Sequence, residues 1–441
     1  MHQNFEPLVT ALREIRRVTL DGSIQGLRSG RIDVAGLGRA AKIGDMVEFC
    51  PDTDRRSLGE ILALENGVAQ VLPEDGLTGL ALGDCVRHLG PAGLFPCKRW
   101  VGRLIDPYLR PLDGLPLPMG SQEVALKAAP PPAAQRGTFG DRMSTGLTSF
   151  DTMLPIVTGQ RIGLFAGSGV GKSTLLADLA RGIDADIVVL ALIGERGHEL
   201  RDFVDNTLGV DGMAKSVVFA ATADQSPILR RRSAWVAMAT AEYFRDQGAN
   251  VLFLMDSVTR FAEAHREIAA SVGEDGNIGG FPSSTAQELM KLSERAGPGL
   301  AGGGSITGIF TVLVPGSDME GPIADIMRGT LDGHIVLDRS IAERGRFPAI
   351  DFLRSVSRCL PAAASDHENE VISQTRSSMR SYADAELMIQ AGLYEPGSVP
   401  EIDKAIEVRP ALEAFFSRKN SEGTHSAFNQ LERCFTGKSE N

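Results

Sequence analysis

Short apolar runs separated by segments of helical length dominate the middle of the chain. The runs are nearly continuous in apolar residues and cover 161–166, 186–193, 216–220, 250–255, 306–314 and 334–337. Strands buried on both faces have this pattern, because neither face needs polar side chains. One intervening segment, 227–247, begins at Ser226 and Pro227, a good N-cap and first-turn pair. The alternation predicts a parallel α/β sheet.

A different pattern precedes this sheet, over residues 19–89. Short alternating runs are broken by turn residues, and Asn66-Gly67 joins two of them. Asn-Gly between two such runs is a strong hairpin signal, because a type I′ turn needs positive φ at both central positions. Several strands in this length predict a small β-barrel. Phe49 is the single aromatic residue of the segment, which leaves no platform for stacking RNA bases.

The two ends of the chain are predicted to be helical. Residues 5–18 have one apolar face, which suits either packing on the same domain or docking on a partner. Helical segments such as 379–392 and 402–416 follow the last strand. The predicted division is a docking helix, a β-barrel, a nucleotide-binding domain and a C-terminal helical domain, with bounds 1–18, 19–92, 93–352 and 353–441.

The overall charge argues against a protein that coats nucleic acid, and the cysteines argue against a zinc site or a disulfide framework. The 441 residues include 45 Lys and Arg and 56 Asp and Glu, which gives a net charge of −11. A protein that coats nucleic acid needs a basic surface instead. The five cysteines are widely spaced and form no C-x-x-C pair, so neither a zinc site nor a disulfide framework is expected. The first residues do not have the pattern of a signal peptide, and we expect a cytoplasmic protein with no nucleic-acid partner.

A glycine-rich segment follows the strand 161–166 and opens a helix. It reads Ala-Gly-Ser-Gly-Val-Gly-Lys-Ser-Thr, a P-loop with alanine in place of the usual first glycine. Such glycines let successive backbone N–H groups curl around the phosphates of ATP. Lys172 supplies a positive charge, and the Ser173 hydroxyl is the expected Mg²⁺ ligand. The predicted nucleotide-binding residues are Gly167, Ser168, Gly169, Val170, Gly171, Lys172, Ser173 and Thr174.

Two other strands end in acidic residues that suit nucleotide hydrolysis. Asp256 ends 250–256 and is predicted to hold Mg²⁺ through water, although Asp256 or Ser257 could instead cap the next helix. Glu195 and Arg196 end the strand that begins at Asp186. Glu195 could polarise the attacking water, and Arg196 could meet the γ-phosphate or restrain Glu195. Taken alone, this pair is better explained as a surface ion pair.

Longer strings of the chain resemble the flagellar export and type III secretion ATPases, which group with the catalytic subunit of rotary ATP synthases. The resemblance spans Gly102 to Ile406 and is weak at both ends of the chain. The similar strings are Gly159–Thr174, Ile193–Gly197, Asp256–Ala269, Ser293–Gly297, Leu331–Leu337, Phe347–Asp351, Ser355–Arg358 and Ala391–Ile406.

The resemblance implies a multi-domain α/β protein with an N-terminal β-barrel, a RecA-like P-loop core and a C-terminal α-helical domain. It implies a homohexamer with ATP at the subunit interfaces. Glu195 becomes the catalytic glutamate, Asp256 the Walker B aspartate, and Arg358 an arginine finger that reaches the γ-phosphate held by a neighbouring subunit. Arginine suits that role because its planar fork spreads charge over the oxygens of the transferring phosphoryl group.

The resemblance also implies three less specific assignments. Phe347 matches a position where an aromatic ring packs on adenine, although an ordinary core phenylalanine is the alternative. Arg196 and Arg260 match arginines on the phosphate side. The chain departs from the family at His198, where arginine is usual, and in the segments 271–284 and 301–305.

The implied activity is ATP hydrolysis that drives protein export at the cytoplasmic face of the inner membrane. The implied partners are a stator-like negative regulator on the N-terminal helix, a central stalk, the export gate in the membrane and chaperone–substrate complexes. One chain that carries both Lys172 and Arg358 needs no second ATPase subunit, which favours the export type. The alternatives are an injectisome ATPase, an RNA translocase of the Rho type and a non-catalytic subunit. The acidic net charge disfavours the RNA translocase. The presence of both Glu195 and Lys172 disfavours the non-catalytic subunit.

Overall fold

The computed structural model describes residues 19–28, 30–50, 57–276, 279–314, 319–420 and 422–436. The predicted docking helix, 1–18, lies outside these residues. The chain divides into two compact units, one formed mainly by residues before Leu94 and the other by most of the remainder. Within the described ranges, none of the helices combines the length and apolar character that a membrane crossing requires.

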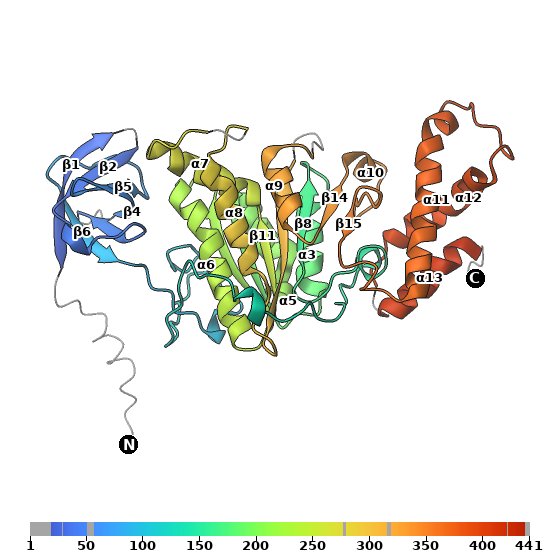
Figure 1. The fold of residues 1–441 in the computed structure, drawn as a ribbon, viewed down its shortest axis with the longest axis horizontal. Helices are drawn as coiled ribbons and strands as arrows, with labels where there is room; N and C mark the ends of the chain where they lie inside the picture. The colour runs from blue at the N-terminus through green and yellow to red at the C-terminus, as the bar shows by residue number, and fades with distance from the viewer. Residues whose placement is uncertain are drawn as a thin grey trace, which may run out of the picture. The chain divides into compact units, whose positions relative to one another are not determined.

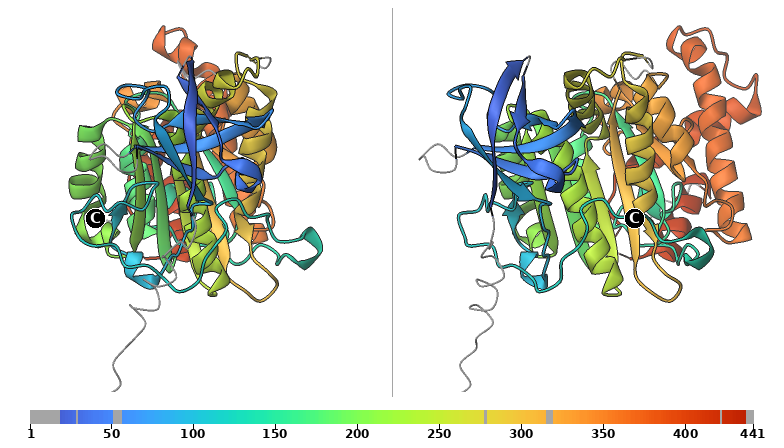
Figure 2. Two further views of the ribbon diagram at one scale, coloured as in Figure 1. Left: turned by 90° about the vertical axis from the view of Figure 1, so that its left-hand side faces the viewer. Right: turned by 60° about the vertical axis from the view of Figure 1, so that its left-hand side comes forward.

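The first unit contains a closed six-stranded barrel (Figures 1 and 2). Its strands, in the order in which they pair, are β1 (Leu20–Arg28), β2 (Arg31–Ala35), β5 (Val68–Pro73), β4 (Ser57–Glu65), β3 (Met46–Phe49) and β6 (Cys85–Gly90). Asn66 and Gly67 have φ of 52° and 79°, which confirms the predicted hairpin between β4 and β5. Phe49 is completely buried in the barrel core, so its ring serves packing.

The second unit is built on a mostly parallel sheet, which confirms the predicted α/β core. Its order is β15-β14-β8-β13-β11-β9-β10-β7, and β12 also pairs with β13. The strands are β7 (Leu104–Ile105), β8 (Arg161–Ala166), β9 (Ile187–Glu195), β10 (Ser216–Thr222), β11 (Asn250–Asp256), β12 (Gly297–Pro298), β13 (Ser305–Leu313), β14 (Gly333–Leu337) and β15 (Val356–Ser357). Among the strands that the structure describes in this sheet, only the short strands β12 and β15 pair antiparallel.

Both faces of this sheet are buried, as the continuous apolar runs predicted. Successive residues of a strand enter different cores: Leu164 joins one and Phe165 the other. The core around Phe165 is covered by α6 (Pro227–Asp246), α7 (Val258–Ser271), α8 (Ser283–Arg295) and α9 (Pro322–Thr330). Figure 1 shows α6 and α8 alongside strand β11. The core around Leu164 includes α3 (Lys172–Gly182).

Shorter helical elements connect the strands. They are α2 (Thr148–Asp151), α4 (Gly197–Asp202), the π-helical turn Phe203–Leu208, α5 (Gly209–Met213), α10 (Arg339–Glu343) and the 3₁₀ turns Gly38–Ala40, Lys98–Trp100 and Ala133–Gln135. Three of these, from α4 to α5, follow β9 with only Arg196 between and so lie shortly after Glu195.

Three C-terminal helices complete the second unit. They are α11 (Asp366–Gln390), α12 (Pro400–Phe416) and α13 (Thr424–Thr436). Ser365 and Glu368 start α11 with a reciprocal capping box, which satisfies two N–H groups at the helix start. Phe416 of α12 stacks on Phe352, with 4.3 Å between ring centroids, and Thr148 donates a 2.8 Å hydrogen bond to the Phe415 carbonyl. These contacts fix the helices to the nucleotide core.

A proline-rich segment around β7 is held by one ion pair. Arg103 donates hydrogen bonds of 2.5 and 2.8 Å to the two oxygens of Asp113, and it also donates to the Leu115 and Pro116 carbonyls. The hydrogen bond from Arg103 lowers the pKa of Asp113 to about 2. Since the pKa is lowered on folding, the carboxylate stabilises the fold above the unfolded pKa and loses this effect as the pH falls toward 2.

We therefore expect Asp113→Asn to lower the free energy of unfolding by about 1 kcal/mol at pH 7, after allowance for solvent screening. The difference from wild type should shrink between pH 4 and pH 2. Urea unfolding followed by tryptophan fluorescence measures it, because Trp100 lies against the same segment and donates to the Pro118 carbonyl. A difference that grows on acidification would contradict the assignment.

Candidate nucleotide and catalytic site

The P-loop lies between the end of β8 and the start of α3, as predicted. Gly169 and Gly171 have φ of 75° and 82°, a backbone conformation that glycine adopts without strain. Gly171 is the N-cap of α3, and Lys172 is its first residue. The N-terminus of a helix carries exposed N–H groups and a partial positive charge, which attract phosphate. Residues 167–174 thus have the geometry of a phosphate cradle.

Lys172 lies among carboxylates from two other strands. Its Nζ forms a short hydrogen-bonded ion pair with Asp256 Oδ1 and lies 3.5 Å from Glu195 Oε1. Thr311 of β13 donates a 2.8 Å hydrogen bond to the same Asp256 oxygen. Parallel strands bring their C-terminal ends to one edge, which explains how residues so far apart in sequence meet.

Glu195 is positioned by the end of β9, directly after Gly194. Burial raises the pKa of the Glu195 carboxyl, the charge of Asp256 raises it further, and Lys172 opposes both. Glu199, in the first turn of α4, also raises it through its charge and a hydrogen bond. A raised pKa makes Glu195 a stronger base than an exposed glutamate, which suits acceptance of a proton from water.

A cavity of about 260 Å³ lies beside these groups. Its lining includes Ser173, Glu195, Glu199 and Asp256. The set offers one hydroxyl and several carboxylate oxygens, which are ligands that Mg²⁺ prefers when phosphates supply the rest. Within the described ranges, no cluster of three or more His, Cys, Asp and Glu could hold a metal by itself. The residues therefore fit an ion that arrives with the nucleotide.

Phe347 lies beside the P-loop and is not a core residue. Its side chain is 49% exposed. A Cβ added to Gly171 would lie 3.1 Å from the ring, which shows how closely the two approach. An exposed ring next to the phosphate loop fits the predicted contact with adenine, and the alternative of an ordinary core phenylalanine does not apply.

Arg196 and Arg260, the two predicted phosphate-side arginines, each pair with a nearby glutamate. Arg196 is 74% exposed and pairs with Glu199 at 3.2 Å. Arg260 pairs with Glu263 at 2.8 Å, while its aliphatic part packs close to Gly194. His198 lines the cavity 4.0 Å from Glu199. Thus the structure brings Lys172, Ser173, Glu195 and Asp256 together, but not these arginines.

Arg358 follows the edge strand β15 and does not line the cavity of its own chain. Its backbone N–H donates to the Asp332 carbonyl at 3.0 Å, and its guanidinium donates to the Arg328 carbonyl at 3.2 Å. Gly333 pairs with Ser357, and a Cβ at position 333 would lie 2.6 Å from the Val356 carbonyl oxygen. The absence of a side chain at Gly333 therefore lets β15 approach and places Arg358.

Two residues of the site were missed by the sequence analysis. Thr311 orients Asp256, but a threonine inside an apolar strand gives no signal of its own. Glu199 lies in the first turn of α4, whereas Glu195 ends β9, so no single helical or strand period connects the two in the sequence.

Comparison with known proteins gives two family matches. Residues 146–357 match the ATP synthase alpha/beta family, nucleotide-binding domain, and residues 364–431 match the T3SS EscN ATPase C-terminal domain. A flagellum-specific ATP synthase of Caulobacter vibrioides is 42% identical over 424 residues, which cover 95% of this chain and 96% of that protein. One from Salmonella typhimurium is 46% identical over 330 residues, 75% and 71% of the two chains.

The solved structures give the same result. The assembled ATPase EscN from the type III secretion system of enteropathogenic E. coli is 36% identical, with a TM-score of 0.85. The match covers 94% of this chain and all of the other. EscN in complex with its central stalk EscO matches at 37% identity with the same TM-score and coverage. The likeness therefore extends over the barrel, the nucleotide core and the C-terminal helices.

Proposed function

The chain belongs to the ATP synthase alpha/beta family, in the branch of the flagellum-specific and type III secretion ATPases, and we propose that it hydrolyses ATP to drive flagellar protein export. The observation that carries the proposal is the meeting of Ser173, Glu195 and Asp256 around one cavity at the P-loop, with Lys172 paired to the two carboxylates. This set holds a nucleotide phosphate and a base for water at one place.

We assign each of these side chains a task in hydrolysis. The P-loop amides and Lys172 bind the β- and γ-phosphates, and Ser173 and Asp256 would hold an Mg²⁺ ion that accompanies them. Such an ion would supply positive charge where negative charge develops on the phosphates. Glu195 orients the attacking water and takes its proton, with Thr311 and Glu199 positioning the two carboxylates.

The working form in this proposal is a homohexamer with the site at each subunit interface. Arg358 then serves the nucleotide of a neighbour, which agrees with its place outside the cavity of its own chain. The likeness to the assembled EscN ATPase supports a ring. Arg196 and Arg260 would have to leave their present partners, Glu199 and Glu263, to reach a γ-phosphate.

A central stalk is the proposed partner of the C-terminal helices, by likeness to EscN in complex with EscO. The end of α11 and the turn after it expose large apolar side chains: Leu387 is 82% exposed and Leu393 is 76% exposed. Such a concentration of exposed apolar residues is typical of a contact surface. Motion of these helices with nucleotide state would be passed to the stalk, and so to the export gate and to the release of substrates from chaperones.

We also propose that residues 1–18 dock on a stator-like negative regulator and so hold the ATPase at the cytoplasmic face of the export apparatus in the inner membrane. Deletion of these residues should abolish co-purification of the regulator while basal ATP hydrolysis stays within about twofold of wild type. Retained co-purification would rule the docking role out.

A motility assay tests the function as a whole. A strain that lacks the gene should not swim, the wild-type chain should restore swimming, and Lys172→Ala should not. Loss of the Lys172 charge removes the main phosphate contact, so we expect hydrolysis to fall by about 10²-fold or more. The high likeness to EscN makes an injectisome ATPase the second candidate. Normal swimming of the deletion strain together with lost secretion of other proteins would favour it.

A further inference from the structure

Arg376 of α11 binds the backbone of the segment that leads to Arg358. Its Nη1 donates to the Phe352 carbonyl at 2.9 Å, and its Nη2 donates to the Ser355 carbonyl at 3.2 Å. Both carbonyls belong to one turn, which ends three residues before Arg358. The planar fork of an arginine can bind two carbonyls at once, whereas a lysine offers a compact point charge. One side chain of a C-terminal helix therefore bridges to the segment that carries the proposed finger.

Burial makes these two hydrogen bonds strong. Arg376 is half-buried, and burial lowers the pKa of its guanidinium, with the charge of Arg380 lowering it further. A guanidinium that has lost water needs acceptors from the protein, and the Phe352 and Ser355 carbonyls supply them. Hydrogen bonds from a charged donor are about twice as strong as those between neutral groups. Loss of Arg376 would thus remove more than a surface contact.

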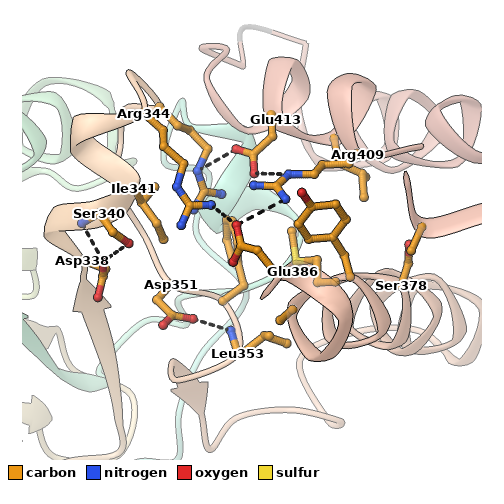
Figure 3. A pocket seen from close by; sticks show the side chains of 17 residues that line it. Asp338, Ser340, Ile341, Arg344, Asp351, Leu353, Ser378, Glu386, Arg409 and Glu413 are labelled. Carbon is orange, nitrogen blue, oxygen red and sulfur yellow. Dashed lines mark hydrogen bonds and ion pairs between the residues drawn. The ribbon is translucent and has the colours of Figure 1, made fainter. Parts of the chain in front are cut away.

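The 352–355 turn is held together by further hydrogen bonds and is joined to β14. Asp351 Oδ1 accepts from the Leu353 N–H at 3.0 Å, as Figure 3 shows. The Ser355 hydroxyl donates to the Asp351 carbonyl at 2.5 Å and accepts from the Val336 N–H at 3.0 Å. Because these bonds connect the parts of the turn, a change at one of its carbonyls displaces the turn as a unit.

A cavity of about 250 Å³ lies beside the bridge that Arg376 makes (Figure 3). Its lining includes Phe352 and Leu353 from the turn, and Ser378 and Met379 from α11. Side-chain packing between the turn and α11 is therefore incomplete at this place. The hydrogen bonds of Arg376 accordingly have a large share in setting how closely the two elements approach.

The turn is connected to Arg358 by a very short strand. β15 has two residues, and it pairs with β14 at Gly333 and His334. Arg358 follows directly and is exposed. Few backbone hydrogen bonds hold a strand of this length, so a displacement of Ser355 is passed on to the guanidinium of Arg358.

We propose that Arg376 is a positioning residue for Arg358. It holds the 352–355 turn at the distance from α11 at which the finger reaches the γ-phosphate bound by a neighbouring subunit. The inference rests on the proposed function, because it requires Arg358 to act as an arginine finger.

Arg376→Met keeps the length and apolar stem of the side chain and removes both donors. We expect the kcat of ATP hydrolysis to fall at least about tenfold, since displacing a catalytic group has effects of this size or larger. The KM for ATP should stay within about twofold of wild type, because Arg376 does not line the cavity at the P-loop. Arg376→Lys keeps the charge and can serve one carbonyl, so it should recover part of the kcat. Arg380→Met is the matched control, at an exposed arginine one turn along α11, and should have wild-type kinetics.

Rings mixed from two variant chains separate a misplaced finger from a damaged fold. Arg376→Met should regain activity with Lys172→Ala, which has an intact finger, but not with Arg358→Ala. Recovery with both variants or with neither would overturn the inference. So would a wild-type kcat in Arg376→Met, an equal loss in Arg380→Met, or no gain in Arg376→Lys over Arg376→Met. Full activity of Lys172→Ala or Arg358→Ala alone would instead refute the proposed function.

Discussion

Glu195→Gln should lower the rate of ATP hydrolysis by about 10²- to 10⁴-fold, because glutamine cannot accept the proton of the attacking water. ATP binding should be kept or strengthened. Lys172 and the P-loop are unchanged, and the substitution removes a negative charge that burial and Asp256 already disfavour. Steady-state phosphate release gives the rate, and titration with a fluorescent ATP analogue gives the affinity.

A matched control is available on the surface of the same unit. Glu343 and Arg339 form an exposed ion pair at α10, with 2.9 Å between them, and neither lines the cavity at the P-loop. Glu343→Gln removes the same charge and should hydrolyse ATP at the wild-type rate. Wild-type hydrolysis by Glu195→Gln would instead revive the hypothesis of a non-catalytic subunit, in which Glu195 and Arg196 are only a surface pair.

The sequence predicted the parts of the fold that depend on local pattern. Continuous apolar runs correspond to β8, β9, β10, β11, β13 and β14, since a strand covered on both faces needs no polar side. Asn66-Gly67 fixed one barrel hairpin through backbone conformation alone. The edge strand β15 was not predicted, because two residues carry no period and its pairing depends on the space left by Gly333.

The site was likewise predictable where it depends on a continuous motif or on the end of a strand. The P-loop is one continuous segment, so its motif identifies all of its residues together. Glu195 and Asp256 end parallel strands, whose C-terminal ends lie at one edge of the sheet. Side-chain partners that meet only through tertiary contact leave no motif in the sequence. The hydrogen bond from Thr311 to Asp256 and the present partners of Arg196 and Arg260 depend on side-chain placement across strands and helices. Arg344 and Glu386, 42 residues apart in sequence, likewise meet only through tertiary packing.

Arg358→Ala should lower hydrolysis by about 10³- to 10⁵-fold if the residue is an arginine finger. The nucleotide affinity of an isolated subunit should not change, because Arg358 lies outside the cavity of its own chain. Arg339→Ala is the matched control, since it removes an exposed arginine of the same unit, and it should be fully active. Arg358→Ala with a rate close to wild type would remove the finger assignment.

Mixing subunits tests whether the finger acts between chains. Lys172→Ala has an inactive P-loop but an intact Arg358, so a ring of Lys172→Ala and Arg358→Ala subunits contains interfaces with both working parts. In a random equal mixture about one interface in four is of this kind, because the P-loop side and the finger side each have an even chance of being intact. Activity should therefore reappear in the mixture and be absent from either variant alone. A mixture that forms rings without activity would contradict action in trans.

Gly333→Ala extends the same test to the placement of the finger. The added Cβ would lie 2.6 Å from the Val356 carbonyl oxygen and 3.5 Å from the Arg358 N, so β15 must move and carry the guanidinium with it. We expect hydrolysis to fall by about 10²-fold or more although Arg358 is present, since small displacements of a catalytic group have effects of this size. A Gly333→Ala subunit should regain activity when mixed with Lys172→Ala, which supplies a correctly placed finger, but not with Arg358→Ala, which supplies none. Recovery with both variants, or with neither, would show that Gly333 acts on the fold and not on Arg358.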